Sequence, residues 1–286
     1  MTFLKLIRAN NWIKNFFILL PLFFSANIFN YQILKLNLII ILCFSFITSS
    51  VYIVNDILDL EYDKRHPEKK NRPIPSGKYK IKQALLIGLL LFLTGILPIY
   101  LISIEAFFIT LSYFIINIIY SFKLKQVPII EMVIVSLGFV LRLIIGGVIS
   151  KVALTHWIIL MVFLLSLFII ISKRRDDVYH YDINKIVNRK VVLQYSLPFI
   201  DKLITIISSI LLVSYLLFIT SDEVINRYDI EYLSLTFLPV LIGVFRYNQL
   251  TYVFKKNSSP IKTLFNDVFL QIVLLIWFIL FFIIIY

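Results

Sequence analysis

The sequence predicts an all-α integral membrane protein with about nine transmembrane helices. Of the 286 residues, 60% are hydrophobic and 15% are charged, whereas a water-soluble domain has roughly 45–50% apolar and about 25% charged residues. The mean hydropathy is +0.93. Apolar runs of about 20 residues, the length needed to cross a bilayer as a helix, recur along the chain. A chain of this length cannot bury so much apolar surface in water, so its solvent is predicted to be the bilayer.

Each predicted span is an apolar run that lies between loops carrying the charged residues. In chain order, the nine runs cover residues 13–29, 36–58, 82–101, 105–122, 128–149, 155–172, 199–220, 232–253 and 264–286. The second and sixth runs end in polar residues. These two helices are therefore expected to carry polar groups to the membrane surface.

Lys and Arg residues concentrate in alternate loops of this arrangement. With the N-terminus in the cytoplasm, the inside segments are 1–14, 61–82, 123–125, 173–202 and 255–262. Of the Lys and Arg residues, the outside loops then hold only Lys35, Lys151 and Arg227. Because positively charged loops remain in the cytoplasm, the N-terminus is predicted to be cytoplasmic and the C-terminus outside. The chain is thus expected to be a multi-pass protein of the cell (inner) membrane.

A single transmembrane domain, residues 1–286, is predicted to account for the sequence. Its longest polar stretches are two cytoplasmic loops near 59–82 and 173–198, where the functional site is expected. The net charge of +12 does not predict nucleic-acid binding, because the basic residues lie in short loops without an interleaved aromatic platform. The single cysteine, Cys43, lies in an apolar run, which excludes an intramolecular disulfide.

The segment 51–77, VYIVNDILDLEYDKRHPEKKNRPIPSG, combines acidic and amide side chains at helical spacing. Asn55, Asp59 and Asp63 are four residues apart, so a helix would place them in one stripe. Asp56 lies about 100° round the helix from Asn55. Oxygen-bearing groups in such a stripe repel one another unless a cation lies among them, and Mg²⁺ prefers oxygen ligands shared with phosphates. We therefore expect Asn55, Asp59 and Asp63 to bind Mg²⁺, with Mn²⁺ as an alternative.

A basic loop follows the acidic stripe. Arg65, Lys69 and Arg72 are candidates for binding phosphate oxygens that the metal leaves exposed. Two prolines and Gly77 predict a shaped loop rather than a helix. The alternative is that the acids only neutralise lysines at the lipid headgroups, but acidic residues have little part in membrane topology.

These residues carry a resemblance to a known family. NDILDLEYD resembles the NDxxDxxxD motif of the UbiA-type intramembrane prenyltransferases, a nine-helix superfamily that binds a diphosphate through Mg²⁺. DKRHPEKKNRPIPSG is similar to the DRxHPxKxxRPI-x-x-G motif of its polyprenyl-phosphate phosphoribosyltransferase branch. The resemblance implies catalytic roles for Asn55, Asp56, Asp59 and Asp63.

Other segments are similar to the same branch and imply further substrate-binding residues. The opening NNWIKNFFILLPLFF contains Lys14, and YSFKLKQVPIIE contains Tyr120, Lys125 and Glu131, where Glu131 replaces the family's Asp. Arg142, in LGFVLRLIIGG, lies well inside an apolar run, where a charge costs about 2.5–3.5 kcal/mol on insertion scales. It must face a polar cavity or a partner, and the family pattern implies contact with substrate phosphates.

The sixth run ends in SKRRDD, which resembles the family's KRRxE. Lys173, Arg174 and Arg175 are expected to face a phosphate, and Asp177 replaces the family's Glu. Topological charge is the alternative explanation for the arginines. Near the end, Arg246 and Asp267 match a weaker part of the pattern.

The resemblance implies transfer of 5-phosphoribose from 5-phosphoribosyl 1-diphosphate to a polyprenyl, decaprenyl-like phosphate, with release of diphosphate. Such a product would supply a cell-envelope polysaccharide. Two alternatives stay open: a prenyltransferase that moves a prenyl group from a prenyl diphosphate to an aromatic or other acceptor, and a membrane transporter. The number of cations near the predicted site favours phosphoribosyl transfer over both alternatives. The sequence leaves the polyprenyl chain and the oligomeric state open, and a homo-oligomer is among the states it allows.

Overall fold

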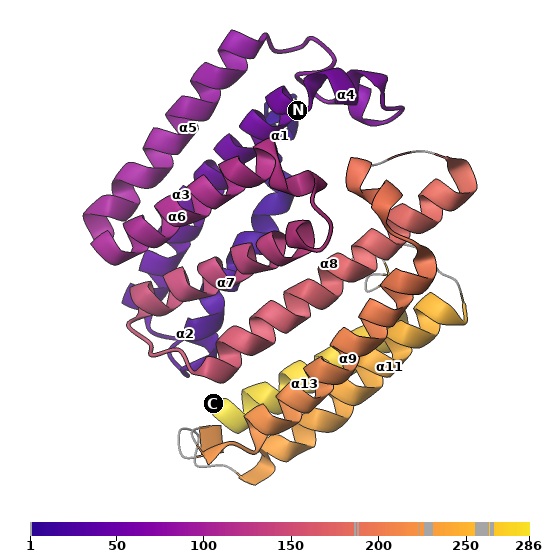
Figure 1. Ribbon diagram of the computed structural model, residues 1–286. Helices are drawn as coiled ribbons and strands as arrows, with labels where there is room; N and C mark the ends of the chain where they lie inside the picture. Colours follow the sequence, from indigo (N-terminus) through magenta and orange to yellow (C-terminus); the bar gives the residue numbers. More distant parts are fainter. Residues whose placement is uncertain are drawn as a thin grey trace. The chain divides into compact units, whose positions relative to one another are not determined.

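The computed structural model describes residues 2–185, 187, 189–222, 224–225, 231–254, 263 and 266–286. The chain divides into two compact units, Met1–Leu154 and Thr155–Tyr286, and each is described by itself. Within the described ranges every regular element is helical (Figure 1). This confirms the predicted all-α class.

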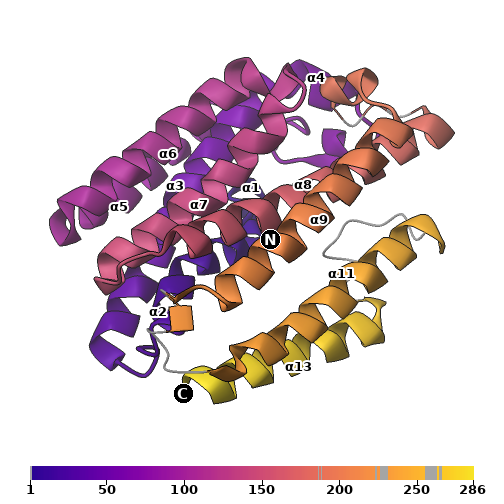
Figure 2. The same ribbon diagram turned by 60° about the horizontal axis from the view of Figure 1, so that its bottom comes forward.

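Unit 1 is built around one long helix. Its α-helices and 3₁₀ helices (η) are α1 (Thr2–Leu6), η1 (Ala9–Leu19), α2 (Leu20–Phe24), α3 (Tyr31–Leu58), α4 (Leu60–Arg65), η2 (Lys69–Asn71), α5 (Ile81–Ile102), α6 (Ile104–Phe122), η3 (Leu124–Gln126) and α7 (Ile130–Ser150). The central helix is α3, which packs against α5, α6, α7 and η1 (Figures 1 and 2). Every other long element of this unit is therefore positioned by contact with α3.

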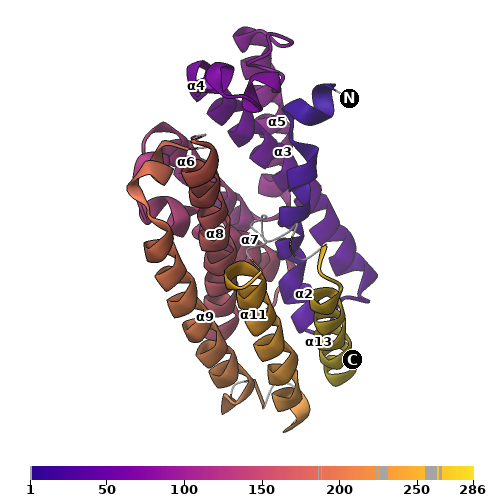
Figure 3. The same ribbon diagram turned by 90° about the vertical axis from the view of Figure 1, so that its right-hand side faces the viewer.

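The long helices among the described residues of unit 2 form two neighbouring pairs. Its elements are α8 (His156–Asn184), η4 (Lys190–Gln194), α9 (Leu197–Ile219), η5 (Glu231–Thr236), α11 (Phe237–Tyr252) and α13 (Val268–Ile285). Figures 2 and 3 show α8 beside α9, and α11 beside α13. A hydrogen-bond chain joins three of these elements, because Trp277 Nε1 donates to Tyr215 Oη (2.9 Å) and Tyr215 Oη donates to Thr236 Oγ1 (2.7 Å).

Two glycines allow backbones to approach closely in the core of unit 1. A Cβ atom on Gly146 of α7 would lie 2.0 Å from the carbonyl oxygen of Ile18 in η1. A Cβ atom on Gly95 of α5 would lie 2.6 Å from the carbonyl oxygen of Cys43 in α3. No larger residue fits at either position without a backbone shift. These contacts fix η1 on α7 and α5 on α3.

The described residues contain six helices that are long and apolar enough to cross a membrane: α3, α5, α6, α7, α8 and α9. They correspond to six of the nine predicted spans. The predicted span 13–29 is instead a 3₁₀ helix followed by the short α2. Pro21 lies in the first turn of α2. The predicted span 232–253 begins as η5, and the last apolar helix is shorter than the other six. The total of nine spans and the sides of the termini stay predictions.

The predicted cytoplasmic loop at 173–198 is a helix over its first half, because α8 continues to Asn184. The expectation of a loop from residue 173 is wrong. The segment 173–184 contains neither Gly nor Pro, and Arg174 and Asp177 form an ion pair one turn apart, which favours a continuous helix. The loop predicted at 59–82 contains α4 and η2.

Candidate active site

The acidic segment lies at the junction of α3 and α4. Asp59 ends α3 and begins α4, with φ −92° and ψ 4°. The backbone N–H of Asp59 still donates to the carbonyl of Asn55 (3.0 Å), and that of Asp63 donates to the carbonyl of Asp59 (2.8 Å). Helical spacing therefore persists through the junction, as the sequence predicted.

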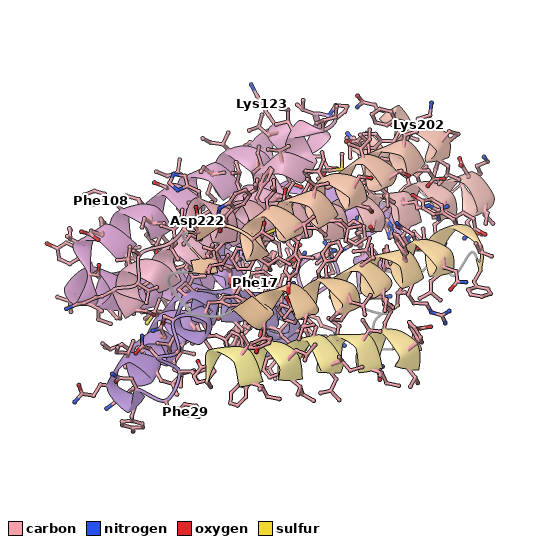
Figure 4. The ribbon with its side chains drawn as sticks, turned by 90° about the horizontal axis from the view of Figure 1, so that it is seen from below. Phe17, Phe29, Phe108, Lys123, Lys202 and Asp222 are labelled. Atoms are coloured by element: carbon pink, nitrogen blue, oxygen red, sulfur yellow. The ribbon has the colours of Figure 1, made fainter. Side chains whose placement is uncertain are left out.

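Asn55 and Asp59 form one half of the site, together with Lys125. Lys125 Nζ donates to Asp59 Oδ1 (2.6 Å) and to Asn55 Oδ1 (3.3 Å). Asn55 Nδ2 donates to Asp59 Oδ2 (3.2 Å). Lys125 reaches these groups from η3, whereas Lys123, two residues earlier, is exposed and points away from the molecule (Figure 4). The structure thus brings together three predicted site residues from two distant segments.

Asp56 and Asp63 form the other half of the site, and both are almost completely buried. Arg72 Nη1 donates to Asp63 Oδ2 (2.6 Å) and to Asp56 Oδ1 (3.1 Å), so one guanidinium bridges the two carboxylates. Arg8 forms a second ion pair with Asp56. The contacts therefore group Asp63 with Asp56 rather than with Asp59, although the helical stripe places Asp63 in line with Asp59.

Arg8 also lies at these carboxylates, although it was not among the residues predicted from the sequence. Its guanidinium lies over the ring of Tyr52, 4.8 Å from the centroid, while it pairs with Asp56. The backbone of Arg8 is left-handed, with φ 51° and ψ 48°. That conformation costs a residue with a side chain roughly 1–2 kcal/mol. The only signal in the sequence is that Arg8 precedes Trp12 and Lys14 in the family-like opening.

The basic loop is held in a defined shape, as the sequence predicted. Ile74 is buried, 4% exposed, in a cluster with Leu6, Ile53 and Ala84. The backbone N–H of Tyr79 donates to the carbonyl of Pro73 (3.2 Å) across the turn. Gly77 has φ +77°, which residues with side chains rarely adopt. This anchoring holds Arg72 at the carboxylates.

The other predicted residues of the basic loop lie nearer the surface. Arg65 is exposed, and the Lys69 ammonium lies over the Tyr62 ring, 5.3 Å from its centroid. Burial raises the pKa of Tyr62, and the neighbouring carboxylates of Asp63 and Asp59 raise it further, so its hydroxyl stays neutral. His66 is buried, and its Nδ1 accepts hydrogen bonds from the backbone N–H of Glu68 (3.2 Å) and of Lys69 (3.3 Å). These contacts shape the loop between α4 and η2.

The donor set at Asn55 and Asp59 fits a shared divalent cation. Their side-chain oxygens already converge on one positive charge, the Lys125 ammonium. In the described ranges, no three His, Cys, Asp or Glu side chains are close enough to hold a metal ion by themselves. One carboxylate and one amide oxygen that converge on the same charge can be shared with a divalent cation, whose remaining ligands would come from water and phosphate.

Arg142 is buried in the core of unit 1, 5% exposed, among neutral partners. Its Nε donates to Asn15 Oδ1 (2.8 Å), its Nη1 to the carbonyl of Gly138 (2.6 Å) and its Nη2 to Tyr113 Oη (3.0 Å). The guanidinium also lies over the rings of Phe44, Tyr113 and Phe139. All of these partners are groups of the protein itself. The predicted contact of Arg142 with substrate phosphates therefore stays a prediction.

Three further predicted residues of unit 1 lie in different settings. Lys14 is half-buried in η1, and Tyr120 is half-buried near the end of α6. Glu131 is completely buried at the start of α7. Their predicted roles in substrate binding stay predictions.

The predicted residues of unit 2 lie on α8. Lys173 is exposed, whereas Arg174 is buried and its Nη1 donates to Asp177 Oδ2 (2.6 Å). Arg175 Nε donates to Asp201 Oδ1 of α9 (2.6 Å). Asp201, near the start of the predicted span 199–220, was not among the predicted site residues. The structure brings these charges together within unit 2.

Arg246 and Asp267, which match the weaker end of the family pattern, form an ion pair in the structure. Arg246 Nη2 donates to Asp267 Oδ2 (2.8 Å), and Arg246 Nε donates to Asp267 Oδ1 (3.3 Å). Asp267 is the N-cap of α13 and accepts from the backbone N–H of Leu270 (3.0 Å). The pair thus joins α11 to the start of α13.

Apolar helices around buried carboxylates and their cations define a class: polytopic membrane proteins with a polar site at the end of a spanning helix. Within it, the chain belongs to the UbiA prenyltransferase family, whose model matches residues 16–273.

Curated relatives and a solved structure agree with this family. The chain is 26% identical to a decaprenyl-phosphate phosphoribosyltransferase of Corynebacterium glutamicum, over 96% of this chain and 83% of that protein. It is also 26% identical to the Mycobacterium tuberculosis protein of that name, over 85% of this chain and 81% of that one. The fold is similar to that of a UbiA homolog from Archaeoglobus fulgidus bound to DMAPP and Mg²⁺, with TM-score 0.72, 19% identity and coverage of 100% and 99%.

Proposed function

We propose that the protein transfers 5-phosphoribose from 5-phosphoribosyl 1-diphosphate to a polyprenyl phosphate in the membrane and releases diphosphate. The observation that carries this proposal is the similarity, over 85% and 96% of the chain, to relatives named for that activity. The site supports the proposal because both substrates are anionic and three cations, from three separate segments, meet at its carboxylates.

The reaction needs no general base. In the proposed step, an oxygen of the acceptor phosphate forms a bond to ribose C1 while the bond from C1 to the diphosphate oxygen breaks. The electron pair of that bond leaves with the diphosphate. The acceptor phosphate is already an anion at neutral pH, so no proton has to be removed. The remaining task is to bring two anionic substrates together, which requires positive charge and positioning.

The residues of the site have separate tasks in this proposal. Arg72 and Lys125, at 30% and 16% side-chain exposure, are accessible enough to bind diphosphate oxygens. Asn55 and Asp59, with Asp63, would hold Mg²⁺ or Mn²⁺, which supplies electrostatic stabilisation of the leaving diphosphate when bound. Lys69 is proposed to bind the 5-phosphate. The α8 residues Lys173, Arg174 and Arg175 of unit 2 are proposed, from the resemblance alone, to bind a substrate phosphate. Tyr120, Glu131 and Asp177 are proposed to contact the ribose or its phosphates.

A transfer assay tests this function. Membranes that contain the protein are incubated with decaprenyl phosphate, Mg²⁺ and radiolabelled 5-phosphoribosyl 1-diphosphate, and the lipids are extracted. We expect label in the organic phase, and no label with Asp59→Asn. Glu61→Gln is the matched control, because Glu61 lies two residues away but is exposed and pairs only with the surface residue Lys64 among its described contacts. An unlabelled lipid phase with correctly folded wild type contradicts the proposal.

Two further arms separate the alternatives. A prenyltransferase would move label from a radiolabelled prenyl diphosphate to an aromatic acceptor, with or without the phosphoribosyl donor. A transporter would accumulate unchanged, water-soluble label inside sealed vesicles. Either result, without label in the lipid product, replaces the proposed function.

A further inference from the structure

We propose that Arg8 is a positioning residue that keeps a permanent counter-ion on Asp56, so that Arg72 can leave the carboxylates and bind a phosphate. This inference rests on the proposed function, because it concerns the diphosphate of the same donor. Arg8 reaches Asp56 from the N-terminal segment, which precedes the first long helix.

The segment 7–15 is fastened to one face of α3 by matched polar contacts, here called the N-terminal seam. Asn15 Nδ2 donates to Ser45 Oγ (2.8 Å), and Trp12 Nε1 donates to Ser49 Oγ (3.0 Å). Ser49 Oγ in turn donates to the carbonyl of Ile7 (2.8 Å). The seam ends with Arg8, which lies over Tyr52 and pairs with Asp56. Residues 45, 49, 52 and 56 share one face of α3, because their spacing is four, three and four.

At its Asn15 end, the N-terminal seam is hydrogen-bonded to α7 and, through Arg142, to α6. Asn15 Oδ1 accepts from Arg142 Nε of α7 (2.8 Å), and Arg142 Nη2 donates to Tyr113 Oη of α6 (3.0 Å). The 3₁₀ geometry of η1 repeats every three residues, which directs Trp12, Asn15 and Ile18 to the same side. The seam therefore holds the N-terminal segment along several turns of α3, and Arg8 is fixed at its outer end.

Arg8 is thus held more firmly than Arg72. The Arg8 guanidinium is confined between the Tyr52 ring and Asp56, and its backbone keeps the left-handed conformation. A residue stays in that conformation when its surroundings require it. Arg72 belongs to a loop and its side chain is more exposed, 30% against 21% for Arg8. Of the two cations at Asp56, Arg72 is therefore the one proposed to turn toward a ligand, which requires it to leave Asp63 as well.

The need for Arg8 follows from burial. Asp56 has only 3% of its side chain exposed, and an isolated carboxylate at such a site is strongly unfavourable. If Arg72 were its only partner, binding of Arg72 to a phosphate would leave Asp56 without a cation. Arg8 removes that penalty at Asp56, because Asp56 keeps one ion pair throughout. Asp63, which also loses Arg72, would then pair with the metal ion that it is proposed to hold. Without Arg8, Arg72 is the only cation left on Asp56 and stays there. The diphosphate then loses its contact with Arg72 and binds more weakly.

The test measures binding of inorganic diphosphate with Mg²⁺, through thermal stabilisation of the detergent-purified protein, independently of turnover. We expect Arg8→Ala to weaken this binding about tenfold or more, the scale of one charge-assisted hydrogen bond. Arg8→Lys keeps the charge and should lose less. Arg8→Ala combined with Asp56→Asn should bind better than Arg8→Ala alone, because a neutral side chain no longer retains Arg72. In the transfer assay, Arg8→Ala should raise KM for the donor more than it lowers kcat.

A second pair of variants tests the seam and remains informative if Arg8→Ala does not fold. Trp12→Phe removes one indole N–H from the seam, and we expect it to weaken diphosphate binding about two- to threefold. Trp277→Phe is the matched control, because it removes an indole N–H that donates to Tyr215 in unit 2 and should leave the affinity unchanged.

The outcomes separate this inference from the proposed function. Wild-type affinity and wild-type KM in Arg8→Ala overturn the inference, as does a double variant that binds no better than Arg8→Ala. Equal effects of Trp12→Phe and Trp277→Phe overturn the role of the seam. A wild type that transfers no phosphoribose but shows the Arg8 dependence of diphosphate binding disproves the proposed function and leaves the role of Arg8 standing. A wild type that binds no diphosphate and transfers nothing overturns both.

Discussion

Asp59 and Asp63 lie four residues apart, yet their surroundings differ sharply. The Asp59 side chain is 28% exposed and meets Lys125, whereas that of Asp63 is 1% exposed and meets Arg72. A carboxylate near the surface can exchange its partner for a hydrated metal ion more readily than a buried one. Asp59 is therefore the better candidate for first contact with a metal, and Asp63 needs Arg72 to move first.

Substitution of Lys125 tests whether its ammonium group takes part in transfer. Lys125→Met removes the ammonium that lies 2.6 Å from Asp59 Oδ1, and we expect kcat/KM for transfer to fall about ten- to hundredfold. Initial rates at low donor concentration measure this change. Lys123→Met is the control, because Lys123 is exposed beyond the end of α6. Equal rates for the two variants would contradict the role of Lys125.

Removal of divalent metal should abolish transfer. The side-chain oxygens of Asn55 and Asp59, which are proposed as metal ligands, are hard donors of the kind that Mg²⁺ and Mn²⁺ prefer. Treatment with EDTA should stop label transfer, and addition of Mg²⁺ should restore it. Full turnover in EDTA would show that the site works through its own cations alone.

Long helices were the elements easiest to predict from the sequence. Continuous apolar runs identified the six helices that, among the described residues, are long and apolar enough to cross a membrane, because a run of about 20 apolar residues has few alternatives to a membrane helix. The segment 13–29 was harder, since apolar composition does not distinguish a 3₁₀ helix from an α-helix. Only the structure shows that Trp12, Asn15 and Ile18 use a spacing of three.

The acidic residues and Lys125 could be predicted because a motif and a helical spacing identify them. Arg8 could not, since its role depends on the N-terminal segment folding back along α3, 48 residues away in sequence. The grouping of Asp56 with Asp63 was also beyond the sequence, because it is set by Arg72 in a separate loop. Long-range ion pairs leave no periodic pattern.

Packing of η1 against α7 gives a stability prediction for a single element. Gly146→Ala would place a Cβ atom 2.0 Å from the Ile18 carbonyl oxygen, and we expect a loss of about 3 kcal/mol, the upper part of the range for overpacking. Thermal unfolding in detergent should show a lower Tm. Gly243→Ala in α11 is the control, because its nearest contact is an ordinary 3.6 Å to Val273. A Tm that falls no further in Gly146→Ala than in Gly243→Ala would contradict the close approach.

For the whole molecule, the charges of the loops predict which side of the membrane each loop occupies. The cationic loop between α4 and α5 is predicted to be cytoplasmic, whereas Lys151, which follows α7, is predicted to be outside. The site at the α3 end shares its side with the cationic loop, because both follow α3 directly. The proposed donor is water-soluble, so its access depends on this orientation.

Single-cysteine labelling can decide the orientation. Cys43 is the single cysteine and is buried, so a Cys43→Ala background carries no thiol. We expect Lys151→Cys to react with an impermeant maleimide in intact cells. Lys78→Cys should react only after the membrane is permeabilised. The reverse pattern would invert the topology and place the site outside.

The site contains three carboxylates, of Asp56, Asp59 and Asp63, and three cations, of Arg8, Arg72 and Lys125. Its charges cancel before any ligand arrives, so its field decays over a short range. Capture of the donor from solution must then depend on the excess charge of +12 elsewhere on the chain. That attraction is screened beyond about 8 Å at physiological ionic strength. Added salt should therefore slow the encounter with the donor, while turnover of donor already bound in the site proceeds at nearly the same rate.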